Sequence, residues 1–268
     1  MRFLKNITVE ELAELPYFEF AACLDICSHK GGINATKQIL KHIKMNDRLR
    51  ILDAGCGIGK TSCYIAKYYN CEVVGIDITK LCIDKAKKLA KKIKLDHKVE
   101  FKIADIYSLP FKDEYFDIVI TENVFSFIKN KDKALKELIR VTKYGGYIGG
   151  NICFRYTKLS YEEKNDLEKI SDEVYKSEQF PYTLEELKNL FEKHSLKEIK
   201  LLIPKNSYIS KLVDYKENIS KLKIFLKNIY LIIINKKIRR RLLALNKNYK
   251  EINEKFSAGF QIIIYKKV

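Results

Sequence analysis

The sequence predicts an α/β fold in which helices cover both faces of a doubly wound, largely parallel sheet. From residue 50 onward, short runs rich in β-branched and aromatic residues alternate with helical runs, which is typical of parallel strands joined by helices. One of these strands leads directly into a glycine-rich loop that opens a helix, over residues 51–60. With 268 residues and 47% hydrophobic side chains, the chain can bury a sizeable core.

The first 45 residues are expected to form an N-terminal helical cap and the first helix of the core. Residues 9–15 and 33–43 have helical periodicity. The second segment places four apolar side chains on one face, namely Ile33, Ile39, Leu40 and Ile43. The Gly31-Gly32 pair breaks the chain between the two helices.

Five strands are expected in the first part of the sheet, at residues 51–54, 72–76, 99–104, 116–121 and 147–154. The helices between them are expected to begin near residues 60, 79 and 132. The third of these helices should run to about Thr142 and stop at the Gly145-Gly146 pair.

The C-terminal part of the chain contributes two further strands and a helical insertion. A capping box from Thr183 to Glu186 predicts a helix through His194, which a sixth strand follows at residues 197–203. The last strand is expected at residues 259–265, where an isoleucine run suits a buried position.

The segment between these two strands, residues 206–255, has a helical pattern. We therefore divide the chain into a core with its N-terminal cap, residues 1–204 and 258–268, and a basic helical insertion, residues 205–257.

The formal net charge of +17 is concentrated near the C-terminus. Residues 218–250 contain ten lysines and arginines and no acidic residue. This region could bind RNA or an anionic membrane surface. The alternative is that a lysine- and isoleucine-rich composition reflects nucleotide bias in the gene, with lysine as the default surface residue.

Several classes of site and location are disfavoured by composition. No window of 18 residues is free of charge, so we expect no transmembrane segment, and the acidic residues near the N-terminus argue against a signal peptide. We expect a cytoplasmic protein with free thiols. Cys23 and Cys27 begin a pattern typical of radical iron–sulfur proteins, but Lys30 stands at its third position. We therefore expect no metal site.

The glycine loop and three strand-end acids form the strongest pattern in the sequence. A dinucleotide-binding fingerprint would require a third glycine where Lys60 stands, so the Gly-x-Gly-x-Gly spacing from residue 55 to 59 favours another ligand. Asp53 precedes the loop, while Asp77 and Asp105 follow the next two strands. At these strand ends, a carboxylate can accept hydrogen bonds from the two hydroxyls of a ribose or from the amine of a base.

Five segments together resemble the successive motifs of class I S-adenosylmethionine-dependent methyltransferases: DAGCGIGK, GIDIT, ADIYSLPF, YFDIVITENVFSFI and KYGGYIGG. The resemblance covers roughly residues 30–155. It implies a Rossmann-like seven-stranded sheet whose last strand is antiparallel, and S-adenosyl-L-methionine as the cofactor.

The resemblance also implies a set of cofactor-binding residues. The loop residues would line the methionine and ribose parts, Asp77 would bind the ribose hydroxyls, and Asp53 would orient the loop and the amino group. Ile78, Asp105 and Ile106 would contact the adenine. The residues that end the fourth strand, Glu122, Asn123 and Val124, would lie beside the methionine part and the transferable methyl group. The complete set is Asp53, Gly55, Cys56, Gly57, Gly59, Asp77, Ile78, Asp105, Ile106, Glu122, Asn123 and Val124.

Methyl transfer is an in-line displacement that requires positioning in a dry pocket, and a general base helps when the acceptor carries a proton. We select His29 and Glu122 as candidate catalytic residues. His29 lies in the segment that relatives place over the cofactor, together with the aromatic residues Tyr17, Phe18 and Phe20.

Differences from the motifs of known methyltransferase classes narrow the kind of methyl acceptor to be expected. The fourth strand ends in Thr-Glu-Asn-Val, without the Pro-Pro element of nucleic-acid N6-adenine and protein glutamine methyltransferases. No proline is followed by the cysteine that cytosine C5 enzymes use. The layout is similar to that of phosphoethanolamine methyltransferases, but Phe127 occupies the position of their histidine.

We therefore expect transfer to a small-molecule substrate at nitrogen, oxygen, sulfur or carbon, with the insertion acting as a lid. An RNA or membrane-lipid methyltransferase that uses the basic insertion is the alternative, and a non-catalytic S-adenosylmethionine-binding module is a further one. Neither the acceptor atom nor the oligomeric state follows from the pattern.

Overall fold

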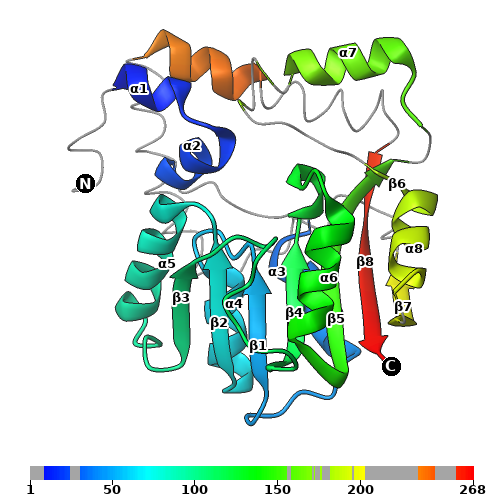
Figure 1. The fold of residues 1–268 in the computed structure, drawn as a ribbon. Coiled ribbons are helices and arrows are strands. Elements are labelled where there is room, and N and C mark those ends of the chain that lie inside the picture. Colours follow the sequence, from blue (N-terminus) through cyan, green and yellow to red (C-terminus); the bar gives the residue numbers. More distant parts are fainter. Residues whose placement is uncertain are drawn as a thin grey trace.

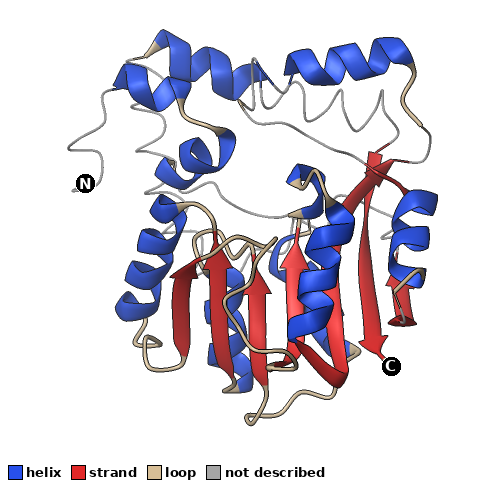
Figure 2. Ribbon diagram, in the orientation of Figure 1, coloured by secondary structure: helices blue, strands red, loops and turns tan. Residues whose placement is uncertain are grey.

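In the computed structural model, strands and helices alternate along the chain as the sequence predicts (Figures 1 and 2). The structure describes residues 9–24, 31–155, 158–170, 172, 176, 182–194, 196–202, 235–244 and 258–268. The strands are β1 Arg50–Ala54, β2 Glu72–Asp77, β3 Val99–Ile103, β4 Phe116–Glu122, β5 Thr142–Arg155, β6 Tyr182–Thr183, β7 Leu196–Leu202 and β8 Ala258–Lys267. The labelled helices are α1 Val9–Glu14, α2 Tyr17–Cys23, α3 Gly32–Lys41, α4 Lys60–Tyr69, α5 Lys80–Lys92, η2 Phe125–Phe127, α6 Lys131–Val141, α7 Tyr161–Ile170 and α8 Leu184–Glu192.

The sheet has the strand order β3-β2-β1-β4-β5-β8-β7. Strands β1 to β5 are parallel to their neighbours, whereas β8 runs antiparallel to both β5 and β7. This arrangement confirms the predicted fold class with its antiparallel last strand. The two-residue strand β6 was not predicted from the sequence; it pairs with the end of β5 and makes the sheet eight-stranded. Two residues are too few for an alternating pattern to be recognised.

Hydrophobic side chains cover both faces of the sheet. Leu52, Val119 and Ile148 point into the layer beneath α6 and α8, while the neighbouring Ile51 and Ile118 point toward α3, α4 and α5. Successive residues of these strands thus face opposite layers, as the period of two requires. Because both faces are covered, the strands read as continuous apolar runs.

The connection between α6 and β5 differs from the prediction. The helix ends at Val141, and β5 begins at once with Thr142, so the Gly145-Gly146 pair lies inside the strand. The register shifts here, and Gly145 has a φ of 73°. A Cβ atom on Gly146 would lie 2.8 Å from the carbonyl oxygen of Asp117. The glycines therefore accommodate a bulge rather than stop a helix.

A helical layer lies over the carboxyl ends of the strands (Figure 1). Of the predicted insertion, the described part forms a helix over residues 236–244, drawn in orange, and the rest lies outside the described residues. Its Ile238 is buried against Leu12 of α1 and Phe20 of α2, and Leu81 of α5 borders the same cluster. The N-terminal cap and this helix thus share one small hydrophobic core.

Within the described ranges, no helix combines the length and the apolar character needed to cross a membrane.

Candidate active site

The glycine loop joins β1 to α4 and is held by the neighbouring strand. The backbone N–H groups of Gly55 and Cys56 both donate to the carbonyl oxygen of Ile76, each at 2.8 Å. Gly55, Gly57 and Gly59 have φ values of 83°, 52° and 78°. These left-handed conformations favour glycine, which explains the spacing recognised in the sequence.

The three glycines serve different purposes. A Cβ atom on Gly55 would lie 2.3 Å from Cγ2 of Val124, and one on Gly59 would lie 2.6 Å from Cζ of Phe101. Within the described part of the chain, a Cβ atom on Gly57 would have no protein atom within 4 Å. Gly55 and Gly59 are therefore required for packing, whereas Gly57 leaves open space above the loop.

Asp77 at the end of β2 supports the loop from the side. Its Oδ2 accepts from the N–H of Gly57 at 2.9 Å, and its Oδ1 accepts from the N–H of Thr79 at 2.8 Å. Burial raises the pKa of this carboxyl group, and these two hydrogen bonds act against that effect. The adjacent Ile78 is 70% exposed and presents an apolar surface beside this carboxyl group. Together they offer a hydrogen-bond acceptor beside an apolar surface.

Asp105 and Ile106 follow β3 at the same edge of the sheet. The carboxylate of Asp105 is exposed, and its Oδ1 accepts from the N–H of Tyr107 at 2.9 Å. Ile106 is partly buried against the core. The N–H of Ala104 donates to the carbonyl oxygen of Asp77 at 3.2 Å, so this turn is tied to the preceding strand end.

Two buried carboxylates lie beneath the loop, and hydroxyl groups hold both of them. Glu122 is 8% exposed and accepts from Oγ1 of Thr36 and from Oγ1 of Thr61, each at 3.0 Å. Asp53 accepts from Oγ of Ser62 at 2.5 Å. Burial raises the pKa of Glu122 to about 7, although the threonine hydroxyls oppose the shift. Glu122 can therefore gain or lose a proton near neutral pH.

These hydroxyl groups were not predicted from the sequence. Thr61 and Ser62 are adjacent in the first turn of α4, and each reaches the carboxylate of a different strand. Small hydroxyl residues in the turn that follows a glycine loop were the available signal. Thr36 lies in α3, and nothing local connects it to Glu122.

The residues after Glu122 turn sharply across the end of β4. Asn123 has a φ of 60°, and its N–H donates to the carbonyl oxygen of Asn151 on β5 at 2.6 Å. The Sγ of Cys153 donates to Oδ1 of Asn123 at 2.9 Å. This conformation brings Val124 onto the glycine loop.

Aromatic residues from α2 and η2 meet near this turn. The ring of Phe127 is stacked with that of Tyr17 at a centroid distance of 6.5 Å and packs edge-on against Phe18 at 4.5 Å. Phe20 does not join them, because it is fully buried in the cap beneath the guanidinium group of Arg241, 4.3 Å from the ring centroid. Phe20 therefore packs within the cap, apart from the rings of Tyr17, Phe18 and Phe127.

The remaining predicted residues have simpler environments. His29 lies outside the described residues, so its catalytic role stays a prediction. Cys56 is buried, and burial raises the pKa of its thiol well above the ordinary value. A thiol that stays protonated is a poor nucleophile, so Cys56 has the properties of a packing residue. Among the described residues, no group of three His, Cys, Asp or Glu side chains could hold a metal ion.

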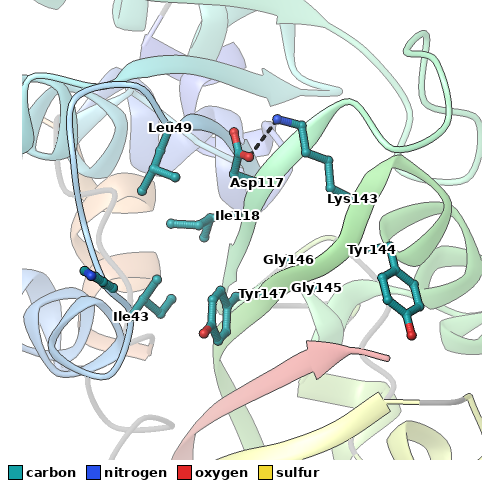
Figure 3. A pocket seen from close by; sticks show the side chains of 10 residues that line it. Ile43, Leu49, Asp117, Ile118, Lys143, Tyr144, Gly145, Gly146 and Tyr147 are labelled. Atoms are coloured by element: carbon teal, nitrogen blue, oxygen red, sulfur yellow. Dashed lines mark hydrogen bonds and ion pairs between the residues drawn. The ribbon is translucent and has the colours of Figure 1, made fainter.

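A hollow at the opposite edge of the sheet is separate from this arrangement (Figure 3). It lies at the amino ends of β1 and β4, bordered by Leu49 and Tyr147. Asp117 in its wall accepts from Nζ of Lys143 at 2.7 Å and from the N–H of Arg50 at 2.8 Å. Its acidic group is thus already paired within the protein.

Comparisons with known proteins agree with the geometry. A sequence model for a methyltransferase domain matches residues 45–200, more than half of the chain. The chain belongs to the class I S-adenosylmethionine-dependent methyltransferase family. This methyltransferase domain is 34% identical over 130 residues to norajmaline N-methyltransferase from Rauvolfia serpentina. The aligned stretch covers 46% of the chain and 44% of that relative. It is also 34% identical over 159 residues to the chloroplastic tocopherol O-methyltransferase from Arabidopsis thaliana, covering 56% of the chain and 44% of that protein.

The chain thus spans less than half the length of each of these two relatives. Among solved structures, phosphoethanolamine N-methyltransferase 2 from Haemonchus contortus in complex with S-adenosyl-L-methionine has a TM-score of 0.71 and 21% identity, covering 99% of the chain and 59% of that chain. The MccD protein has a TM-score of 0.69 and 21% identity, covering 90% of the chain and 100% of that chain. These structural likenesses show the methyltransferase fold.

The cofactor of this methyltransferase domain is S-adenosylmethionine, and the residues at the carboxyl edge fit it. Among the described residues, no protein atom lies within 4 Å of a Cβ built on Gly57, and the exposed Ile78 is adjacent to Asp77 in the chain. An apolar surface beside a fixed hydrogen-bond acceptor suits a nucleoside. The role of each residue toward the cofactor stays a prediction.

Proposed function

We propose that the protein transfers the methyl group of S-adenosylmethionine to a small-molecule acceptor. The observation that carries this proposal is the helical layer over the carboxyl edge. In it, α1, α2 and the helix over residues 236–244 share one buried cluster, which Leu81 at the start of α5 borders. Leu81 lies four residues after Asp77, so this layer adjoins the proposed ribose site. Helices beside the site are suited to exclude water from an acceptor small enough to be enclosed.

The names of the relatives support the same class of acceptor. They act on norajmaline at nitrogen and on tocopherol at oxygen, and another relative is the sterol 24-C-methyltransferase of Candida albicans. These acceptors are small molecules or lipids. Because the three relatives differ in the acceptor atom, we leave the atom open among nitrogen, oxygen, sulfur and carbon.

When bound, the cofactor supplies a methyl group activated by a sulfonium centre, ready for in-line displacement. The glycine loop and Asp77 would bind and orient the cofactor, and Tyr17, Phe18 and Phe127 would exclude water and offer ring faces to positive charge. Glu122 is the proposed catalytic carboxylate, since with a pKa of about 7 it can hold a proton taken from the acceptor.

A membrane-lipid acceptor is the second candidate, and one surface favours it. On the helix over residues 236–244, Arg239 and Arg240 are exposed, and the neighbouring Leu243 is 63% exposed. Exposed arginines beside an exposed leucine are typical of a helix that contacts anionic lipid. Arg241 is buried in the cap, so the three arginines do not form one continuous basic surface. The cytoplasmic location and an RNA contact stay predictions.

The test is transfer of labelled methyl from S-adenosylmethionine into a cell extract, followed by separation into small-molecule, lipid, protein and RNA fractions. We expect label in the small-molecule fraction and no transfer by the Asp77→Ala variant. Label in the lipid or RNA fraction would replace the proposed acceptor class. Cofactor binding without transfer into any fraction would indicate a non-catalytic binding module.

Charge reversal separates the roles of the insertion. The double variant Arg239→Glu, Arg240→Glu should leave binding to anionic vesicles and RNA unchanged if the helix acts only as a lid. Loss of vesicle binding would favour the membrane contact.

A further inference from the structure

The strand β5 extends beyond the end of β4 at the carboxyl edge of the sheet. The last residue of β4, Glu122, pairs with Asn151, and β5 continues to Arg155. At about 3.3 Å per residue, this extension carries Arg155 roughly 13 Å past the level of Glu122. The end of β5 therefore borders the half of the edge that the glycine loop, Asp77 and Asp105 do not occupy.

Arg155 lies on the face of β5 that carries site residues. Phe154 belongs to the hydrophobic layer beneath α6 and α8, so its neighbours Cys153 and Arg155 point to the opposite face. Cys153 contacts Asn123, the residue after Glu122. Arg155 thus shares a face with the residues that surround the end of β4.

The guanidinium group of Arg155 is buried and incompletely paired. The side chain is 7% exposed, and among the described residues none accepts a hydrogen bond from its Nε. The buried cation of Lys131, by contrast, has partners. Its Nζ donates to the carbonyl oxygen of Ile128 at 2.8 Å and lies 4.0 Å from the ring centroid of Tyr182. A buried cation without a close anion is strongly unfavourable, so its presence needs an explanation.

Two acidic residues influence Arg155 only from a distance. Burial lowers the pKa of its guanidinium group, and Glu163 and Glu186 oppose that effect, but neither forms an ion pair with Arg155 within the part of the chain that the structure describes. Glu186 is instead engaged in the capping box of α8, where its Oε2 accepts from the N–H of Thr183 at 2.8 Å. An arginine remains charged even when buried, so among the described residues this positive charge has no ion-pair partner.

We propose that Arg155 binds an acidic group, a carboxylate or a phosphate, on the methyl acceptor. This inference rests on the proposed function. The planar guanidinium group matches both anions, and two parallel N–H donors hold either one in a fixed orientation. Bound there, the anion neutralises the buried charge and anchors the acceptor beside the end of β4.

Thermal denaturation with saturating S-adenosylhomocysteine tests the anion site directly. Inorganic phosphate and sodium acetate, each compared with sodium chloride at equal ionic strength, are the two probes. At ten times its dissociation constant, a bound anion should raise the melting temperature by about 3 °C. The Arg155→Met variant should lose this shift, and the control Arg48→Met, at an exposed position before β1, should keep it. The probe that gives the larger shift identifies the acidic group.

The same variant distinguishes a ligand site from a structural role. In anion-free buffer, Arg155→Met should melt at the same or a higher temperature than the wild type, because it removes an unmatched buried charge. A lower melting temperature, or an anion shift retained in the variant, would overturn the proposal. Unchanged affinity for S-adenosylhomocysteine shows that the variant is folded, and Arg155→Lys provides a second variant if it is not.

Transfer assays then separate this proposal from the proposed function. Extract passed over an anion exchanger at alkaline pH should lose the acceptor, whereas extract passed over a cation exchanger should keep it. Arg155→Met should lower transfer into untreated extract roughly 10- to 100-fold, as expected for loss of a charged hydrogen bond. Label in an acceptor that survives anion removal would overturn the anion site alone. Absence of label in every extract would refute the proposed function.

Discussion

Replacing Glu122 by glutamine should remove a pH dependence of stability that this one carboxyl group creates. Burial raises the pKa of Glu122 from its ordinary value of 4.5 to about 7 in the folded protein. Below pH 4.5 the group is protonated in both the folded and unfolded states. Between these two values the folded state keeps a proton that the unfolded state has lost, so stability falls as the pH rises.

The magnitude follows from the size of this window. Each pH unit in which the two states differ by one proton costs about 1.4 kcal/mol, and the whole shift therefore costs about 3 kcal/mol above pH 7. Glutamine cannot ionise. The stability of Glu122→Gln relative to the wild type should thus rise by about 3 kcal/mol between pH 4.5 and pH 8.

Urea denaturation of both proteins at pH 4.5, 6 and 8 measures this difference. The control is Glu137→Gln, because the guanidinium group of Arg140 lowers the pKa of Glu137. The stability that this pair contributes is present above pH 4.5 and is lost only as the pH falls below that value, so the control should stay nearly constant over these three pH values. If the difference between Glu122→Gln and wild type is the same at all three pH values, Glu122 does not titrate in this range and the reasoning fails.

Three further changes test the loop and the cap. Asp77→Ala should weaken binding of S-adenosylhomocysteine at least about 100-fold in calorimetry, because the two hydrogen bonds from the ribose hydroxyls to its carboxylate would be lost. Unchanged affinity would disprove its role in binding the ribose. Gly59→Ala should lower the free energy of unfolding by about 3 kcal/mol, because it combines left-handed strain with a clash, whereas Gly57→Ala should cost only about 1 kcal/mol. Equal losses in urea denaturation would contradict this distinction. Arg241→Ala should destabilise the protein by about 2 kcal/mol and Arg240→Ala by less than about 0.5 kcal/mol, and reversal of this order in thermal melts would contradict the packing of the cap.

Local signals made much of the architecture predictable. The run of alternating elements predicted the parallel strands, and the capping box at Thr183 is present with both of its hydrogen bonds. The left-handed φ angles of the loop glycines explain why their spacing was recognisable. The antiparallel orientation of β8 came from the family resemblance, because nothing in an isoleucine run indicates strand direction.

Contacts between residues far apart in the sequence could not be predicted from local patterns. Thr36 and Glu122 are separated by 86 residues and meet only because α3 packs beside the end of β4. Phe20 has the same apolar character as Phe18, yet its position in α2 directs it into the cap core. The Gly145-Gly146 pair was misinterpreted because a glycine pair is equally typical of a helix end and of a bulge.

The bulge at the start of β5 has a consequence for insertions and deletions. The pairs on either side of the bulge are Phe116 with Thr142 and Ile118 with Tyr147, so four residues of β5 stand opposite one residue of β4. Residues added or removed within this stretch change the size of the bulge and leave the pairs after it in place. Ile148, Ile152 and Phe154 then keep their positions beneath α6 and α8. Length variation should therefore be tolerated at the bulge and not farther along β5, where loss of one residue would direct Arg155 into the apolar layer.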